Sequence, residues 1–346
     1  MKHQTTRYGE IPFYKIGTFG NTADAFISKK LFLEYRTKYS FPKKGDILIS
    51  ASGTIGRAVI YDGKPAYFQD SNIVWIDNDE TLVKNDFLFY AYSNVKWNTE
   101  HTTILRLYND NFRNTLIPLP PLNEQNAIAN ILSALDRYLY ALDALILKKE
   151  GVKKSLSFEL LSQRKRLKGF NQAWQKVRLG DIANYLTSNL SAEQITQQGK
   201  IKVYDVNNFI GYTDTTFISD KPYISIVKDG SVGRVRILPP KTNILSTMGA
   251  LIANHKTTTE FLFYLLSNFD FKNFTSGSII PHIYFKDYKE KTIFLPPLNE
   301  QIAIADILSA LDKEITSLKN KKRQFENIKK ALNHDLMSAK IRVLKK

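Results

Sequence analysis

An eighteen-residue phrase that occurs twice is the strongest constraint on how this chain folds. It reads LPPLNEQNAIANILSALD from residue 119 and LPPLNEQIAIADILSALD from residue 295, with sixteen identical positions. The copies lie 176 residues apart in a chain of 346 residues. Repetition at such a long period predicts two similar structural units, one for each copy.

Each copy of the phrase is expected to start a helix. Pro120–Pro121 and Pro296–Pro297 interrupt regular structure, because proline neither donates to a strand ladder nor continues a helix. We expect Asn123 and Asn299 to be the N-caps of these helices. A carboxylate in the first turn then suits the positive end of the helix dipole. The first-turn residues are Glu124, Gln125, Glu300 and Gln301.

Apolar residues continue from each phrase at alternating steps of four and three. This 3.5-residue spacing predicts a coiled-coil seam, and the matching seams favour pairing of the two helices with each other. The alternative is two amphipathic helices that each pack on their own domain. The seams contain Ile128, Leu132, Leu135, Leu139, Leu142 and Ile146 in one helix and Ile304, Leu308, Leu311, Ile315 and Leu318 in the other.

The seam spacing also predicts the length of the helices. It continues to Gln163 and Leu167 after the first phrase and to Ala339 and Val343 after the second. Each helix would then have about 45 residues and a length of roughly 65–70 Å. Gly151 is a weak point, costing about 1 kcal/mol relative to alanine.

Two blocks outside the helices are rich in aromatic and β-branched residues, glycine and asparagine, which predicts short strands and loops. We call residues 1–118 the first head and residues 169–294 the second head. Gly53–Arg57 resembles Gly230–Arg234, and Ile104–Tyr108 takes the place of Ile280–Tyr284, so the heads should share a fold. For the glycine pairs a turn or hairpin is favoured over a phosphate-binding loop.

The composition indicates a polyanionic partner. There are 49 Lys and Arg residues against 33 Asp and Glu, giving a net charge of +16. Clustered cations of this kind attract phosphates and release their counterions. No run of about 18 apolar residues occurs and no signal peptide is recognisable at the start, so we expect a cytoplasmic protein with no membrane span.

Catalytic signatures are missing from the sequence. The absence of cysteine excludes disulfides, thiolate catalysis and cysteine-based metal sites. The five histidines show no metal-ligand spacing, and no phosphate loop, dinucleotide fingerprint or nucleophile elbow is present. We therefore expect a protein that binds and positions, with no catalytic or metal-ligating residue and no cofactor of its own.

The heads supply the side chains that readers of DNA use. Arg and Lys suit guanine edges and phosphates, whereas Asn suits adenine edges. For Arg57 and Arg234, which recur at matched places, a structural role in the loop is weighed equally with DNA contact. The candidates are Lys29, Lys30, Arg36, Lys38, Arg57, Arg106, Asn109, Arg113, Asn207, Asn208, Arg234, Arg236, His282 and Lys286.

The repeated phrase, each time closing a divergent block and opening a heptad helix, resembles the specificity subunit (HsdS) of type I restriction–modification systems. The resemblance covers essentially the whole chain. It implies an α+β fold with two similar mixed α/β target-recognition domains, each followed by a conserved spacer helix. The spacers would pair as an antiparallel coiled coil with pseudo-two-fold symmetry. The implied segments are 1–118, 119–168, 169–294 and 295–346.

The resemblance also implies a function. Each head would read one half of a bipartite site in double-stranded DNA, and the helices would fix the gap between the halves. The subunit itself would be non-catalytic. Two methyltransferase (M) subunits and restriction (R) subunits would be its partners, and S-adenosylmethionine, ATP and Mg²⁺ would belong to them.

The first head departs from the family pattern at its start. The second head opens with Trp174–Ile182, about 30 residues before Tyr204, whereas only 13 residues precede Tyr14 and none resembles that opening. The family usually opens both heads in this way.

Two other functions are compatible with the sequence. One is a non-enzymatic coiled-coil scaffold whose heads bind proteins. The other is the specificity subunit of a related two-subunit restriction enzyme.

Overall fold

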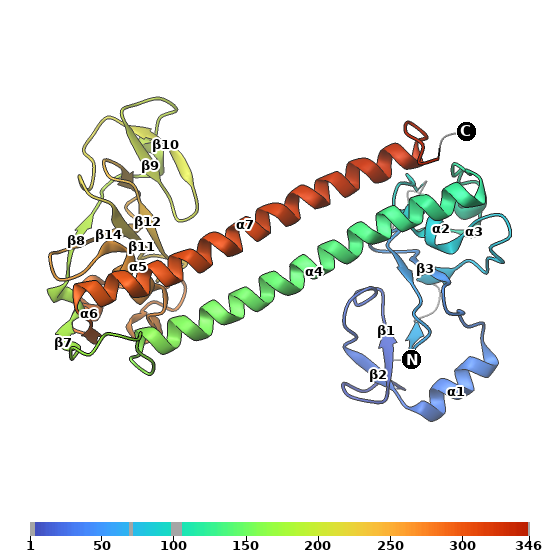
Figure 1. The fold of residues 1–346 in the computed structure, drawn as a ribbon, viewed down its shortest axis with the longest axis horizontal. Helices are drawn as coiled ribbons and strands as arrows, with labels where there is room; N and C mark the ends of the chain where they lie inside the picture. The colour runs from blue at the N-terminus through green and yellow to red at the C-terminus, as the bar shows by residue number, and fades with distance from the viewer. Residues whose placement is uncertain (1–3, 69–71, 98–105, 345–346) are drawn as a thin grey trace. The chain divides into compact units, whose positions relative to one another are not determined.

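The chain divides into two units, each containing one head. The structure is a computed structural model that describes residues 4–68, 72–97 and 106–344. Unit 1 comprises residues 1–143 and 320–346, and unit 2 comprises residues 144–319. Each unit holds part of two helices of 40 residues, α4 (Leu122–Leu161) and α7 (Leu298–Met337) (Figure 1).

The described residues of the first head form two three-stranded sheets. In one, β1 is antiparallel to β2 and parallel to β5, and in the other β3 is antiparallel to both β4 and β6. All four residues of β3 are buried, as expected for an apolar central strand. The strands are β1 (Ile11–Tyr14), β2 (Ala25–Ile27), β3 (Ile47–Ser50), β4 (Ala58–Ile60), β5 (Tyr67–Phe68) and β6 (Ile73–Trp75).

Short helices accompany these sheets in the described part of the first head: α1 (Lys29–Lys38), α2 (Asn85–Tyr92) and α3 (Asn109–Arg113). Helix α1 begins after Ser28, whose Oγ accepts a hydrogen bond of 3.2 Å from the Leu31 N–H. The apolar face of α2 packs against the buried strand β3.

The second head has the same two sheets with additional strands. Strand β9 lies between β10 and β13, with the same directions as β1 between β2 and β5. The other sheet has the order β12-β11-β14-β8, and a separate pair joins β15 to β7. The strands are β7 (Gln175–Arg178), β8 (Ala183–Thr187), β9 (Ile201–Tyr204), β10 (Phe209–Thr213), β11 (Tyr223–Val227), β12 (Val235–Leu238), β13 (Asn243–Ile244), β14 (Met248–Ala253) and β15 (Thr292–Leu295).

The predicted likeness of the two heads is confirmed by these pairings. Helices α5 (Thr259–Ser267) and α6 (Phe285–Tyr288) take the places of α2 and α3. Among the described residues, the first head has no counterpart of β7 and β8, and the second head has no counterpart of α1. The predicted α+β class and the presence of two similar heads are therefore confirmed, and the heads differ at their starts.

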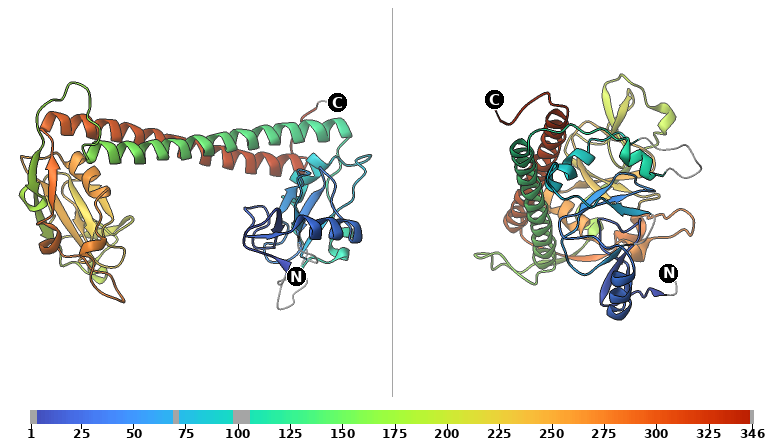
Figure 2. Two further views of the ribbon diagram at one scale, coloured as in Figure 1. Left: turned by 90° about the horizontal axis from the view of Figure 1, so that it is seen from below. Right: turned by 90° about the vertical axis from the view of Figure 1, so that its right-hand side faces the viewer.

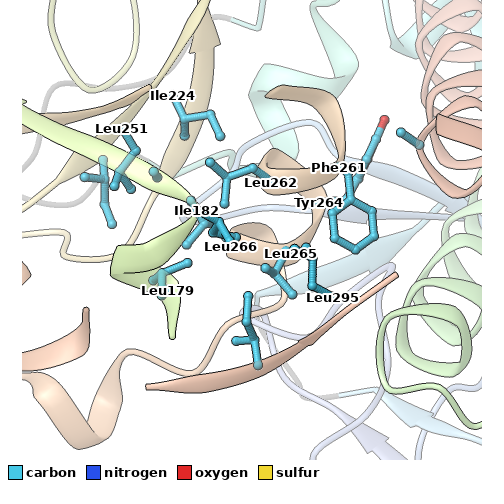
Figure 3. Packing of buried hydrophobic residues seen from close by; sticks show 14 of the residues in the cluster. Leu179, Ile182, Ile224, Leu251, Phe261, Leu262, Tyr264, Leu265, Leu266 and Leu295 are labelled. Atoms are coloured by element: carbon cyan, nitrogen blue, oxygen red, sulfur yellow. The ribbon is translucent and has the colours of Figure 1, made fainter. Parts of the chain in front are cut away.

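Helix α5 and the opening segment of the second head share one core. Figure 3 shows Leu179 and Ile182 from the opening segment among Leu262 and Leu266 of α5. Leu179, Ile182 and Leu262 have no exposed surface. Burial of such side chains is worth about 1.5–3 kcal/mol each, so the opening segment contributes substantially to the stability of this head.

Parts of α4 and α7 lie side by side and antiparallel within each unit (Figures 1 and 2). In unit 1, Asp136 pairs with Lys329 and Asp143 with Lys322, so residue numbers rise along one helix as they fall along the other. In unit 2, Lys153 pairs with Asp312 at 2.5 Å. The predicted seam is confirmed along α4, where its positions from 128 to 160 are all buried or half-buried.

The helices end earlier than the seam predicted. Gln163 and Ala339 lie just beyond the helices with φ of 61° and 55°, and that left-handed conformation stops an α-helix. At the end of α7, Ala339 N–H donates to Leu336 O and Lys340 N–H to Asp335 O, the pattern of a Schellman motif. Leu167 and Val343 therefore pack against cores from the segments that follow the helices.

The prediction that Asn123 and Asn299 are N-caps is wrong, because both helices begin one residue before the asparagine. The carbonyl of Pro121 accepts the first helical hydrogen bond, from Gln125 N–H at 2.9 Å, so the helix begins before the asparagine. Asn123 still serves the first turn, since its Oδ1 accepts from Glu124 N–H at 2.9 Å. Asn299 does the same for Glu300.

The glycines give a test of the backbone in the second head. Gly233 has a φ of +80°, and a Cβ there would lie 2.6 Å from Cδ2 of Phe271. Gly233→Ala should lower the free energy of unfolding by about 1–3 kcal/mol. Gly151→Ala in α4, where a Cβ meets nothing within 4 Å, should raise it by about 0.5–1 kcal/mol. Urea titration followed by circular dichroism measures both, and equal stability of the two variants would contradict the backbone described.

Glu124 gives a test by pH. The hydrogen bonds from Arg342 lower the pKa of the Glu124 carboxyl below its ordinary value of 4.5. A lowered folded-state pKa stabilises the protein above the unfolded-state pKa, and this contribution is lost as pH falls through the folded-state pKa. Glu124→Gln should therefore lower the melting temperature at pH 7, and its difference from the unaltered chain should shrink below about pH 4.5. A difference independent of pH would contradict the pairing.

Candidate nucleic-acid interface

Each head presents a glycine-flanked loop between two antiparallel strands. Residues 51–57 join β3 to β4, and residues 228–234 join β11 to β12, so the hairpin prediction for these glycine pairs is confirmed. Gly56 N–H donates to Ser50 O at 3.0 Å, and Gly233 N–H donates to Val227 O at 2.9 Å. The two loops therefore close in the same way.

An aromatic side chain packs on the second glycine of each loop. A Cβ on Gly56 would lie 2.2 Å from Nε1 of Trp97, just as one on Gly233 would meet Phe271. Only glycine fits both this contact and the positive φ. The loop backbone is thus held in place directly before Arg57 and Arg234.

In the first head, a main-chain oxygen holds Arg57 and a side-chain oxygen holds Arg106. The Arg57 Nη1–H donates to the carbonyl of Phe19 at 3.0 Å. Arg106 enters the same region by a β-bridge to Ser52, and its Nη2–H donates to Asn72 Oδ1 at 3.2 Å. Both guanidinium groups keep further N–H donors beyond these contacts.

The second head gathers three of the predicted residues into one cluster. The Arg234 Nη2–H donates to Asn207 Oδ1 at 2.9 Å, and the Arg236 Nη1–H donates to Asn207 O at 2.8 Å. The Arg236 guanidinium also lies 5.3 Å from the ring centroid of Tyr204. Asp205 Oδ1 fixes the turn by accepting from the N–H groups of Asn207 and Asn208.

His282 takes the position in the second head that Arg106 takes in the first. It forms a β-bridge with Asp229 in the glycine-flanked loop, and its Nδ1 lies 2.7 Å from Asp229 Oδ1. The Tyr284 ring lies nearly parallel to the imidazole at 6.5 Å. The side chain that crosses to the loop therefore differs between the heads although the backbone bridge is the same.

The arginines at these loops carry charge that no carboxylate neutralises. In the described part of the chain, Arg57, Arg106, Arg234 and Arg236 form no ion pair, and the partners of their hydrogen bonds are neutral oxygens. By contrast, Arg178 pairs with Glu290 at 2.9 Å. Neutral acceptors orient a guanidinium without cancelling its charge, which leaves it able to bind a phosphate or a base edge.

The remaining predicted residues are exposed but are not joined to the loops. Within the described residues, no hydrogen bond or ion pair connects them to residues 51–57 or 228–234. Arg113 pairs with Asp110 at 3.5 Å, and Lys286 lies 5.5 Å from the Tyr284 ring centroid. Lys29, Lys30, Arg36 and Lys38 are on α1, Asn109 and Arg113 on α3, Asn208 in the turn after β9, and Lys286 on α6.

The predicted spacer residues are used inside the chain. Gln125 accepts from the Lys84 N–H at 2.8 Å and donates to the carbonyls of Leu82 and Pro120, which fixes α4 to the first head. Gln301 makes the corresponding contacts in the second head. Leu132 and Leu308 have no exposed surface, Leu135 and Leu311 are half-buried, and Glu124 and Glu300 are paired with arginines.

The last residue of the repeated phrase has a role that the sequence reading missed. Asp312 accepts from the Tyr264 O–H at 2.9 Å and pairs with Lys153, whose ammonium lies over the Tyr264 ring. Asp136 joins Tyr90 and Lys329 in the same way in unit 1. Burial and the hydrogen bond to the carboxylate raise the pKa of both tyrosines, so each phenol remains a donor. The sequence did contain a signal for this role, because both copies of the repeated phrase end in aspartate, as Asp136 and Asp312.

Two features that other functions would need are absent from the described residues. No group of three or more His, Asp or Glu side chains could hold a metal ion there. None of the described helices combines the length and apolar character that crossing a bilayer requires.

Comparison with known families agrees with the two-headed architecture. The model of the type I restriction modification DNA specificity domain matches residues 1–149 and 171–327. The chain is 62% identical over 137 residues to a protein of Haemophilus influenzae named as a type I restriction enzyme specificity subunit. That match covers 39% of this chain and 36% of the relative.

Two further comparisons extend over most of the chain. A protein of Methanocaldococcus jannaschii named as the MjaX specificity subunit is 29% identical over 335 residues, covering 86% of this chain and 79% of the relative. The crystal structure of a type I restriction–modification S subunit from M. genitalium superposes with a TM-score of 0.66 at 20% identity. It covers 97% of this chain and 91% of that one, and it supports the fold.

The unpaired arginines lead to a test of DNA binding. Replacing both Arg234 and Arg236 by alanine should weaken binding to duplex DNA at least tenfold at 100 mM salt. The slope of log affinity against log salt should fall by about one for each phosphate that the variant no longer binds. Arg178→Ala is the matched control, because that guanidinium is already paired with carboxylates. Fluorescence anisotropy measures both quantities, and equal losses for the control and the double variant would contradict the assignment.

Proposed function

Because the chain belongs to the family of type I restriction–modification DNA specificity subunits, we propose that it reads a bipartite target in double-stranded DNA, one head for each half-site. The two matches to the specificity domain, one over each head, are the observation that carries the proposal. The two glycine-flanked loops support it, since each head orients arginines without neutralising them.

The side chains around the loops suggest how the heads read different bases. Arginine recognises guanine through its O6 and N7 acceptors, and asparagine recognises adenine. The second head offers Arg234, Arg236 and the half-buried imidazole of His282, whereas the first offers Arg57 and Arg106 in a loop held by other partners. Equal loop backbones with unequal side chains would give two half-sites of different sequence.

The two long helices would set the number of base pairs between the half-sites. A helix of 40 residues is about 60 Å long, which is sufficient to separate readers by one turn of DNA, ~34 Å. Their antiparallel pairing within each unit gives the chain two equivalent sets of contacts, which fits the use of two copies of one partner.

The partners we propose are two methyltransferase (M) subunits and restriction (R) subunits. In this assignment the chain is non-catalytic, and S-adenosylmethionine, ATP and Mg²⁺ act in the partner subunits. Its own residues hold and orient the DNA. The cytoplasm, where the DNA of a cell is accessible to such a complex, would be the location.

Replacement of one head tests the division of the target. Exchanging residues 1–118 for the corresponding head of another family member should change one half of the methylated motif and leave the other half and the gap unchanged. Exchanging residues 169–294 should change the other half only. Single-molecule mapping of methylated bases in cells that carry the M subunit reads both outcomes directly.

Two results would contradict the proposal. One is a change in both halves after a single exchange. The other is methylation by the S–M complex without any sequence preference. A scaffold whose heads bind only proteins would show no duplex affinity at any salt concentration, and anisotropy titration of the purified chain would reveal that.

A further inference from the structure

The first head has an unpaired extended segment where the second head has a paired strand. Residues 116–119 stand 176 positions before β15, at the same distance from the repeated phrase. Strand β15 pairs antiparallel with β7, with Ile293 opposite Val177 and Leu295 opposite Gln175. Among the described residues, no strand pairs with residues 116–119.

The exposure of matched side chains measures what is uncovered in the first head. Leu295 is 5% exposed, whereas Leu119, its counterpart, is 46% exposed. Leu251 of β14 is fully buried beside β8, whereas Ile76, which follows β6 at the equivalent register, is 37% exposed. The uncovered positions are therefore those that adjoin β7 and β8 in the second head.

The hydrogen-bond partners of the buried glutamate at the start of each long helix also differ between the two units. In unit 2, Glu300 accepts from Trp174 Nε1–H at 3.0 Å as well as from Arg166. In unit 1, Arg342 is the only side chain among the described residues that donates to Glu124. The side chain of Arg342 is 49% exposed, against 26% for Arg166. Glu124 thus lacks the indole partner that Trp174 provides to Glu300, and the backbone N–H of Val343 acts on its carboxylate beside Arg342.

We propose that this edge of the first head binds an extended segment of another polypeptide, with a tryptophan for Glu124 followed by a strand that pairs with residues 116–119. The chemistry of the partner is read from Trp174–Ile182, which occupies the equivalent edge within this chain. It comprises an indole donor, a four-residue strand, and apolar residues five and eight positions after the tryptophan.

The backbone of residues 116–119 suits this kind of pairing. Leu179 N–H donates to Lys291 O at 3.0 Å, so residues 291, 293 and 295 are the hydrogen-bonded positions of the pair. Pro118 is the counterpart of Phe294, a position whose N–H points away from β7. The missing N–H of Pro118 therefore costs no hydrogen bond on the proposed edge, and Ile117 and Leu119 remain free to pair.

One feature of the first head limits how far the partner extends. Gly249 of β14 makes room for Tyr185 of β8, since a Cβ there would lie 2.3 Å from the tyrosine Oη. The register of β6 on β3 places Val74 at that position. A segment that continued with a large residue like Tyr185 would clash, so the partner should end, or carry a small residue, beyond the position of Ala183.

A labelled peptide of residues 172–183 tests the proposal on the full-length chain without DNA. It should bind saturably, as measured by fluorescence anisotropy. Changing its Trp174 to alanine and its Leu179 to aspartate should weaken binding at least tenfold. Extending it to residue 187 should give no gain, whereas the same extension with Tyr185→Gly should bind at least as tightly as the short peptide.

Variants of the chain locate the bound peptide. Leu119→Asp should abolish binding, and Glu124→Gln should weaken it, while circular dichroism confirms that both variants fold. Phe294→Asp, at the exposed face of the paired strand in the second head, is the matched control and should bind as the unaltered chain does. Absence of saturable binding would overturn the proposal, as would binding that Leu119→Asp leaves unchanged. Because no DNA is present, either result leaves the proposed DNA reading untouched.

Discussion

The pairing of a buried glutamate with an arginine is the contact on which the rest of each unit depends. Glu300 has no exposed surface, and Arg166 binds both of its carboxylate oxygens, at 2.6 and 3.1 Å. A carboxylate so placed would be strongly destabilising without a cation. Arg166 comes from the segment after α4, and Glu300 begins α7, so the pair joins the end of one long helix to the start of the other. Arg342 and Glu124 do the same in unit 1.

The polar contacts along the helices decide their register. An apolar seam alone tolerates several alignments, because shifting by a heptad restores similar packing. The Tyr–Asp–Lys groups at Asp136 and Asp312 remove that freedom, since each ties two helices and a head helix together. The halves are nevertheless not identical. Tyr138 packs on Phe325 in unit 1, where unit 2 has the ion pair between Glu314 and Lys149 at the equivalent positions.

The sequence predicted the periodic features and missed those that depend on distant partners. The leucine seam, the two long helices, the likeness of the heads and the glycine hairpins followed from spacing and repetition. The helix ends did not, because Gln163 and Ala339 adopt left-handed backbone although neither is glycine. Gln125 was read as a first-turn residue, but its function is to bind the backbone of a head some 40 residues earlier in the chain. Of the candidate DNA contacts, only the group at Asn207 is brought together by hydrogen bonds, and no periodicity encodes that.

The way each head holds its arginine bears on how specificity can diverge. Arg57 is held by the carbonyl of Phe19, a main-chain group that survives substitution of any side chain around it. Arg234 is held by the side chain of Asn207, so a change of that one residue would free or redirect the guanidinium. The two loops are supported by equivalent strands and equivalent glycine contacts in the two heads. Such side-chain changes therefore need not disturb the fold. If each head reads one half-site, as proposed, divergent side chains on a repeated backbone would allow the half-sites to change independently while the helices and their buried ion pairs stay fixed.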